Sequence, residues 1–320
     1  MSSGKLRAAV VGCGSFGANH LRVIAQANEC QLVAAVDADS ERAVAAAASH
    51  PGCEALTDWR ELAGQVDVAV VATPTVQHSE IGCGLLEAGV DVLIEKPIAA
   101  TVVQAERLVE TARARGRILQ VGHLERFNSG VMALESVVTV PLFFEIHRLS
   151  MFAPRSLDVD VVLDLMIHDI DIVLALVGKL PEEVRAAGVR ILSSKVDIAN
   201  VRLAFPGGCI ANLTASRVST EKVRKLRLFQ PHQYISVDYT RQDGMAFTVG
   251  DNQQIGFQPL GQDKKEPLVA QWDSFVDSVR RRSAPRVTGE QATLALQVCM
   301  DILAKIEEHG AVVAQTLHEV

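Results

Sequence analysis

The stretch Val10-Val11-Gly12-Cys13-Gly14-Ser15-Phe16-Gly17 decides the fold, because it places glycines at G-x-G-x-x-G spacing between two regular patterns. Residues 6–11 form an apolar run that predicts a buried strand, and residues 16–28 predict a helix. In such a motif the first glycine allows a tight turn, the second admits a pyrophosphate, and the third lets helix and strand pack closely. The helix N-terminus offers free N–H groups to the phosphates. The sequence therefore predicts a dinucleotide site at Gly12, Gly14, Ser15, Phe16 and Gly17.

Asp37 supports this prediction, since it ends the next predicted strand, residues 31–36, twenty residues after Gly17. An acidic side chain at that position binds the ribose diol of adenosine. It also repels a 2′-phosphate, and no Arg or Lys follows before Arg42, so the sequence favours NAD over NADP. The alternative is a glycine turn that serves only packing, with Asp37 as a helix cap.

Strands and helices alternate through the first part of the chain. Further strands are predicted at 67–72, 91–95 and 118–122, and helices at 40–49, 77–88 and 101–115. This alternation is typical of βαβ units with right-handed crossovers around a parallel sheet. We therefore expect an α/β, doubly wound NAD-binding domain over residues 1–125.

The pattern changes after that point, because predicted strands follow one another without helices between them. They lie at 141–150, 183–192, 198–205, 210–217, 223–229 and 234–239. Helices are expected at 161–177, 268–282 and 289–309, and the polar stretch 241–265 is expected to be rich in loops. Successive strands imply an antiparallel sheet, so we expect residues 126–320 to form an α+β domain for substrate binding and oligomerisation. Its two closing helices are candidates for packing against the first domain.

Residues after the predicted sheet strands supply further candidates, because ligands of open α/β sheets bind at the carboxyl ends of the strands. Glu95-Lys96-Pro97 follows one strand, puts a lysine beside the reacting carbon and makes Glu95 and Lys96 candidate cofactor contacts. Thr73 and Pro74 follow another and are expected to face the cofactor, with His78 at the helix start. A helix-start proline and a surface histidine are an equally good interpretation of the last two.

The apolar helix near residue 165 carries an unusual set of polar residues. Asp164 and His168 are four positions apart and Asp171 follows His168 by three, so we expect all of them on one face. His168 is the candidate base for an alcohol proton, with Asp164 as its orienter or as a substrate ligand. Lys96 would stabilise the developing alkoxide. A Lys96 base, or a purely structural helix network, remains open.

His123 and Arg126 follow the last predicted strand of the first sheet. They are candidate ligands for substrate hydroxyls or phosphates, although an ion pair between domains is an equally good interpretation.

Composition narrows the possible functions. The 320 residues are 48% hydrophobic and 22% charged, which is typical of a globular protein, and the net charge of −7 argues against nucleic acid. The apolar runs are too short for a membrane span, and the start lacks a signal-peptide pattern. The six cysteines form no CxxC pair and no Cys/His cluster, which argues against zinc and disulfides. We expect no bound metal and reduced thiols in a cytoplasmic protein.

The glycine turn, Glu95-Lys96-Pro97 and Asp164-x-x-x-His168-x-x-Asp171 together resemble the Gfo/Idh/MocA oxidoreductase family over essentially the whole chain. The resemblance implies a Rossmann domain and a C-terminal domain whose open, mainly antiparallel sheet commonly mediates oligomerisation. It also implies sugar or cyclitol substrates, with Lys96 and His168 in the catalytic centre. A homo-oligomer, dimer or tetramer, is therefore expected.

Residues 121–128 and 164–171, with 226–230 and 237–238, look more narrowly like the UDP-N-acetylglucosamine 3-dehydrogenase subgroup. That likeness implies oxidation of the 3-hydroxyl of a UDP-amino sugar, whose ketone an aminotransferase uses in making amide-linked lipid A. The alternatives are a dehydrogenase of a free sugar or cyclitol, an enzyme that recycles NADH internally, and a non-catalytic cofactor-binding regulator.

Overall fold

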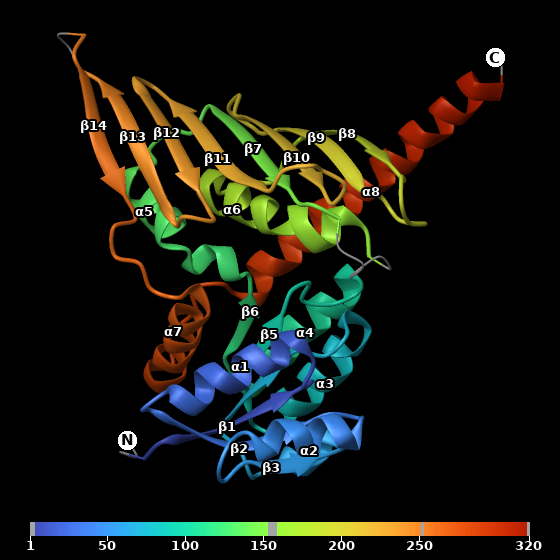
Figure 1. The fold of residues 1–320 in the computed structure, drawn as a ribbon, viewed down its shortest axis with the longest axis vertical. Coiled ribbons are helices and arrows are strands. Elements are labelled where there is room, and N and C mark those ends of the chain that lie inside the picture. The colour runs from blue at the N-terminus through green and yellow to red at the C-terminus, as the bar shows by residue number, and fades with distance from the viewer. Residues whose placement is uncertain (1–3, 153–158, 251–252, 319–320) are drawn as a thin grey trace. The chain divides into compact units, whose positions relative to one another are not determined.

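The computed structural model describes residues 4–152, 159–250 and 253–318, which belong to two compact units (Figure 1). The first unit contains the described residues up to Leu124 together with Glu266–Thr293. The second contains those of Glu125–Lys265 and the chain from Leu294 onward. Each unit has its own buried hydrophobic cluster.

The first unit is built on a parallel six-stranded sheet in the order β3-β2-β1-β4-β5-β6. Its strands are β1 (Leu6–Val11), β2 (Cys30–Val36), β3 (Glu54–Leu56), β4 (Val68–Val71), β5 (Asp91–Glu95) and β6 (Leu119–Gly122). Its helices are α1 (Ser15–Gln26), α2 (Ser40–Ala48), α3 (Thr75–Glu87), α4 (Val102–Arg115) and α7 (Pro267–Arg281). The strand order reverses between β1 and β4, which is where sheets of this kind bind nucleotides.

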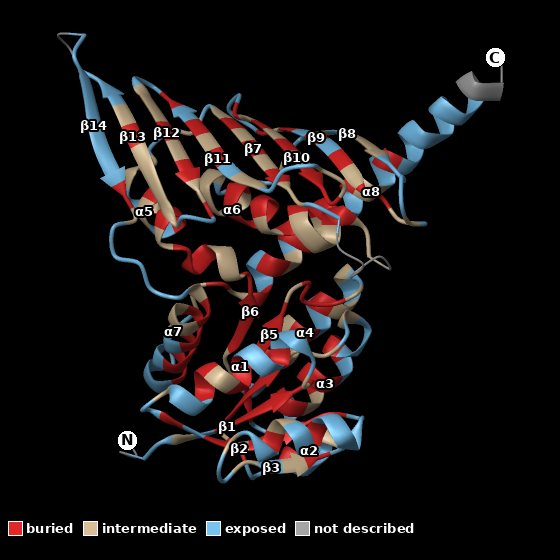
Figure 2. Ribbon diagram, in the orientation of Figure 1, coloured by how far each residue is buried: buried red, intermediate tan, exposed pale blue. Residues whose placement is uncertain are grey.

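The strands of this sheet are buried almost throughout, as Figure 2 shows, because helices cover both faces of the sheet. Local signals fix the helix ends. Asp39 caps α2 by accepting from the Glu41 and Arg42 amides, and Thr101 caps α4 through the Gln104 amide. Gly116 ends α4 in the left-handed region, with φ of 59°.

The second unit is an eight-stranded sheet in the order β14-β13-β12-β11-β7-β10-β9-β8, antiparallel except between β7 and β10. Its strands are β7 (Phe143–Leu149), β8 (Glu183–Val189), β9 (Ile198–Ala204), β10 (Ile210–Ser216), β11 (Val223–Gln230), β12 (Gln233–Asp238), β13 (Asp243–Val249) and β14 (Ile255–Leu260). Its helices are α5 (Ser129–Val137), α6 (Ile167–Val177) and most of α8 (Gly289–His318). In Figure 1 these helices lie on one face of the sheet and leave the other face open.

The expected fold class is confirmed, but one detail of the expectation is wrong and one strand of the first sheet was not predicted. Residues 241–265, expected to be rich in loops, contain β13 and β14. Five of the six residues of β14 are exposed, so this edge strand lacks the apolar alternation that identifies a strand in sequence. The three-residue β3 is likewise too short to give a periodic signal. Among the described residues, no helix combines the length and the apolar character that a membrane crossing requires.

Candidate active site

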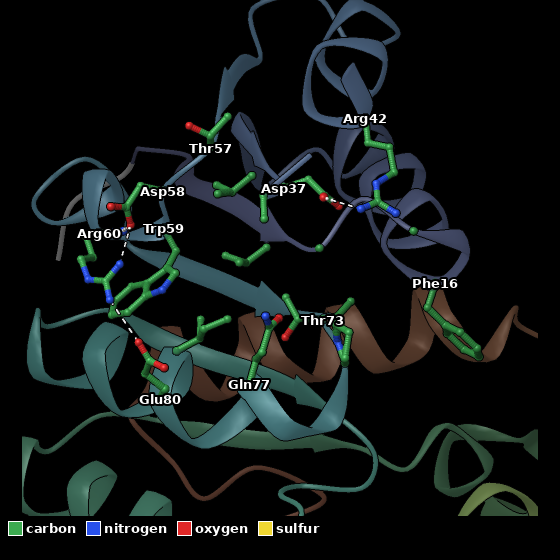
Figure 3. A pocket seen from close by; sticks show the side chains of 18 of the residues that line it. Phe16, Asp37, Arg42, Thr57, Asp58, Trp59, Arg60, Thr73, Gln77 and Glu80 are labelled. Atoms are coloured by element: carbon green, nitrogen blue, oxygen red, sulfur yellow. Dashed lines mark hydrogen bonds and ion pairs between the residues drawn. The ribbon is translucent and has the colours of Figure 1, made fainter. Parts of the chain in front are cut away.

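A cavity of about 730 Å³ lies in the first unit, at the carboxyl ends of β1, β2 and β4 (Figure 3). Of the predicted cofactor residues, Asp37, the loop after β4 and the glycine turn apart from Gly17 line it. They are Gly12, Gly14, Ser15, Phe16, Asp37, Thr73 and Pro74.

The three motif glycines have separate structural reasons. Gly12 has φ of 96°, and a Cβ there would lie 2.6 Å from the Ala72 carbonyl oxygen, so β1 and the loop after β4 approach closely. A Cβ on Gly17 would overlap the Gly12 carbonyl, so the helix can pack against the turn only with glycine. A Cβ on Gly14 would meet nothing within 4 Å. The space beside Gly14 is therefore open to a ligand.

Asp37 is held firmly by its neighbours. Its Oδ2 accepts from the Cys13 amide at 2.8 Å, and its Oδ1 accepts from the Asp39 amide at 3.0 Å. Arg42 folds back so that Nη2 lies 3.1 Å from Oδ1 of Asp37, a pair visible in Figure 3. In the sequence Arg42 is only the first basic residue after Asp37. In the structure its side chain reaches the Asp37 carboxylate and lines the cavity.

The far side of the cavity is formed by residues that the sequence did not single out. They are Thr57, Asp58, Trp59, Arg60, Gln77 and Glu80. Arg60 reaches Asp58 and Glu80, each at 3.1 Å, and stacks on Trp59 with its guanidinium carbon 4.7 Å from the ring centre. The available signal was Asp58, which caps the short helical turn Trp59–Leu62. Because β3 could not be recognised in the sequence, no pattern indicated that the turn Trp59–Leu62 lies beside the glycine motif.

His78 does not line this cavity and is not a surface residue. Its ring is buried, with Nδ1 2.8 Å from the Pro97 carbonyl oxygen and Nε2 2.8 Å from that of Thr73. Burial lowers the pKa of His78, although the two carbonyls oppose that shift. His78 therefore lies between the loop after β4 and the residue that follows Lys96, and in its neutral form it donates to one of the two carbonyls.

Glu95 and Lys96 lie at the carboxyl end of β5, as expected, with Glu95 buried and Lys96 half-buried. The Glu95 carboxylate contacts His20 of α1, whose Nε2 lies 2.8 Å from Oε1 of Glu95. Neither Glu95 nor Lys96 is among the residues that line the 730 Å³ cavity.

In the second unit, Asp164 lies in a π-helical turn, Val162–Met166, directly before α6. The Ile167 amide donates to the Val162 carbonyl across this wider turn. Such turns are rare and are frequent at functional sites. Asp164 and His168 are half-buried, whereas Asp171 is buried.

Two buried arginines form ion pairs with the two carboxylates of α6. Arg148 binds Asp169 through Nε and Nη2, both at 2.8 Å, and reaches Glu125 through Nη1 at 2.8 Å. Arg126 lies 3.3 Å from Glu135 and 3.7 Å from Asp171. These two ion pairs of Arg126 lie within the second unit. His123, in the first unit, is buried.

Comparison with known proteins assigns the family. Residues 6–123 match the family model described as "Oxidoreductase family, NAD-binding Rossmann fold", and residues 135–235 match the "GFO/IDH/MocA C-terminal domain". The chain belongs to the Gfo/Idh/MocA oxidoreductase family.

Individual relatives within the Gfo/Idh/MocA family span nearly the whole chain. A UDP-N-acetylglucosamine 3-dehydrogenase of Acidithiobacillus ferrooxidans is 32% identical over 94% of this chain and 97% of its own length. The solved structure of that enzyme has a TM-score of 0.89, with coverage of 95% of this chain and 98% of that one. An inositol 2-dehydrogenase of Burkholderia multivorans is 28% identical over 96% of this chain and 95% of its own.

As a member of the Gfo/Idh/MocA family, the chain is an NAD-binding oxidoreductase, and its cavity fits NAD. Gly14 leaves space for a pyrophosphate at the N-terminus of α1, and Asp37 is an acceptor for a ribose diol. Oγ1 of Thr73 is buried and has no hydrogen-bond partner in the described part of the chain. A buried hydroxyl without a partner on the wall of a cavity is suited to a ligand.

Proposed function

We propose that this protein is an NAD-dependent dehydrogenase of a UDP-amino sugar such as UDP-N-acetylglucosamine, acting at C3. The observation that carries the proposal is the likeness to the Acidithiobacillus ferrooxidans enzyme, 32% identical along nearly the whole of both chains. A likeness of that extent covers both units, including the segments around Lys96 and His168.

In this proposal the chain's own groups handle the proton and the charge at the reacting oxygen. His168 removes the hydroxyl proton, Asp164 orients His168 or binds the sugar, and Lys96 stabilises the alkoxide as it develops. Lys96 as the base is the alternative assignment. NAD, when bound, supplies the hydride acceptor.

We assign the two remaining candidates differently. His123 stays a proposed substrate ligand. Arg126 is buried and engaged by Glu135 and Asp171, so we propose that it supports α6 and does not bind substrate.

Oxidation of a free sugar or cyclitol is the second candidate. It is favoured by the inositol 2-dehydrogenases among the relatives, of which the Burkholderia multivorans enzyme spans nearly the whole chain at 28% identity. A non-catalytic regulator is the weakest candidate, because Lys96, Asp164 and His168 are all present.

Substrate profiling at constant NAD tests the proposal. We expect UDP-N-acetylglucosamine to be oxidised with a kcat/KM at least about tenfold above those of N-acetylglucosamine and myo-inositol, a difference of about 1.4 kcal/mol. A coupled 3-aminotransferase with an amino donor would draw off the ketone and prevent a stall at equilibrium. Preference for myo-inositol would favour the second candidate, and binding of NAD without turnover of any sugar would favour the regulator.

We also propose that the open face of the second unit's sheet binds a second copy of the chain. An aromatic stripe crosses this face through neighbouring rings, with centroids 5.0 to 5.7 Å apart. The stripe consists of Phe143, Phe229, Tyr234, Phe247 and Phe257. Phe257 is 65% exposed, and exposed apolar patches of this kind mark interaction sites.

The proposed setting is cytoplasmic synthesis of the cell envelope. The six cysteines, all of them in the described part of the chain, are thiols and not disulfides, as a reducing compartment would leave them. The ketone product would then supply a 3-aminotransferase and, through it, amide-linked lipid A.

A further inference from the structure

A buried polar pair, His20 and Glu95, connects α1 to the residue before Lys96. Nε2 of His20 lies 2.8 Å from Oε1 of Glu95, and both residues are buried. His20 lies on the helix that begins at the glycine turn, and Glu95 is the last residue of β5. The pair therefore joins the helix at the phosphate end of the cofactor cavity to the strand that leads into the proposed catalytic lysine.

The Glu95 carboxylate also holds the main chain at that lysine. Its Oε2 accepts from the Lys96 amide at 3.3 Å while its Oε1 is engaged by His20. A carboxylate oxygen accepts hydrogen bonds, so in this contact we assign the ring proton of His20 to Nε2. With His20 removed, a buried carboxylate would lose one of its two bonds and could rotate away from the Lys96 amide.

The neighbouring strand β6 leaves space for the Glu95 carboxylate because the residue opposite it is a glycine. Gly122 of β6 is opposite Glu95 in the parallel register. A Cβ on Gly122 would lie 2.8 Å from Oε2 and 2.9 Å from Oε1 of Glu95. Gly122 does not have a positive φ, so the need for glycine there comes from the carboxylate and not from the backbone.

Packing alone does not explain a histidine at this position of α1. Nδ1 of His20 is buried and has no hydrogen-bond partner among the described residues. The next core positions on the same helix, Leu21, Val23 and Ile24, are apolar. An apolar side chain would fill this position in the core without leaving a buried ring nitrogen unbonded. What His20 adds is therefore its polar contact with Glu95.

We propose that His20 is a positioning residue: by holding Glu95 against the Lys96 amide, it fixes where Lys96 stands for the reaction. This inference rests on the proposed role of Lys96 and deepens it. A misplacement of about 1 Å in a catalytic group can cost about a hundredfold in rate.

The test compares His20→Ala with His20→Gln, measuring the single-turnover rate of NAD reduction, KM and the Kd of NAD. We expect His20→Ala to slow the chemical step about 10- to 100-fold, with KM and the Kd of NAD within about twofold. His20→Gln should recover most of the rate, because its amide nitrogen can donate in place of Nε2. A rate for His20→Ala equal to wild type, or no recovery in His20→Gln, would overturn the proposal.

Two further variants separate positioning from stability. Val23→Ala removes packing from the same helix face, so it should lower Tm without changing the rate per folded molecule. Gly122→Ala keeps both members of the pair but displaces the carboxylate, so it should reproduce the slow step of His20→Ala. It also carries the test if His20→Ala does not fold, and a normal rate in Gly122→Ala would contradict the proposal.

Failure of the proposed function is distinguishable from failure of this inference. If wild type oxidises no sugar, the reactivity of Lys96 toward a small amine-acylating ester, read by mass spectrometry on the whole protein, replaces turnover. We then expect His20→Ala, but not His20→Gln, to change the Lys96 acylation rate at least about threefold relative to Lys179, a change of about 0.6 kcal/mol. Equal rates in all three proteins would overturn the inference.

Discussion

The three glycines of the turn are needed for different reasons. Gly12 and Gly17 are glycines because the backbone is crowded there, whereas Gly14 borders open space. A larger side chain is therefore tolerated by the fold at Gly14 and excluded at the other two positions. Position 14 is where cofactor binding can be changed without disturbing the turn.

We predict that Gly14→Val folds with a Tm close to wild type but binds NAD about 10- to 100-fold more weakly, as expected for the loss of one charge-assisted hydrogen bond. Calorimetric titration with NAD and a thermal melt measure both effects. Gly17→Ala, whose new Cβ would overlap the Gly12 carbonyl, is the control that lowers Tm. Unchanged NAD affinity in Gly14→Val would place the pyrophosphate elsewhere.

Asp37 and Arg42 have opposite effects on the choice between NAD and NADP. The Asp37 carboxylate repels a 2′-phosphate, whereas the Arg42 guanidinium, once released from Asp37, can bind one. We predict that Asp37→Ser shifts the ratio of the NADP and NAD dissociation constants toward NADP by about tenfold or more, because Arg42 is released to a phosphate. Asp58→Ser, in the same cavity but paired with Arg60, should leave the ratio unchanged. The shift should vanish in Asp37→Ser/Arg42→Ala; if it persisted, Arg42 would not be its cause.

At the scale of elements, α6 is anchored through its carboxylates. Arg148 is fully buried and binds both Asp169, which follows His168, and Glu125, which precedes α5. Its guanidinium also stacks on the Tyr239 ring at 4.8 Å. Burial, followed by the nearby Asp169 charge, raises the pKa of Tyr239 well above its usual value, so this ring stays neutral.

We predict that Arg148→Met lowers the free energy of unfolding by about 3–5 kcal/mol, because it leaves the Asp169 carboxylate buried and unpaired. Arg148→Met/Asp169→Asn should recover part of the loss, since the Asp169 charge is then no longer stranded. Denaturant unfolding of wild type, Arg148→Met, Asp169→Asn and the double variant measures this. A double variant less stable than the sum of both single changes would contradict the ion-pair explanation.

The turn between β8 and β9 is closed by Asp197, which is fully buried. Burial would raise the pKa of its carboxyl, but hydrogen bonds from the amides of Ile191, Leu192 and Ser193 outweigh it and lower the pKa to about 2. Since the unfolded pKa is about 3.9, this contribution to stability is full above about pH 4 and is lost as the pH falls toward 2.

We therefore predict that Asp197→Asn has a lower Tm than wild type at pH 7. The difference in Tm between the two proteins should become smaller as the pH falls from 4 to about 2. Thermal melts of both proteins across that range measure the gap. A gap that stays constant between these pH values would show that Asp197 does not titrate differently in the folded state.

Periodic elements and short-range motifs were predictable from the sequence. The glycine turn, Asp37 and the helix around His168 all follow from spacing alone. The Trp59 wall and the His20–Glu95 pair depend on contacts between elements distant in the chain, which no local pattern encodes. Arg42 is close to Asp37 in sequence, but its contact with Asp37 depends on the side-chain conformation, which the spacing does not give. The π turn at Asp164 was missed for another reason: a single five-residue step leaves the apolar period of the helix almost unchanged.

At the scale of the whole molecule, the exposed aromatic stripe is the basis for assembly. We predict that Phe229→Glu/Phe247→Glu lowers the particle mass measured by sedimentation, because two carboxylates on the stripe would be desolvated in an interface between copies. Val76→Glu, at another exposed apolar residue in the first unit, should leave the mass unchanged. A monomeric wild type, or an unaltered mass in the double variant, would rule out this face as the interface.

The most direct measurement of the central claim is absorbance at the reduced-nicotinamide band after the protein is mixed with NAD and UDP-N-acetylglucosamine. We predict that wild type reduces NAD only when the nucleotide sugar is present. Lys96→Ala and His168→Ala should bind NAD with normal affinity yet give no signal. Near-normal reduction in both variants, or a wild type that binds NAD and leaves this sugar unoxidised, would contradict the account.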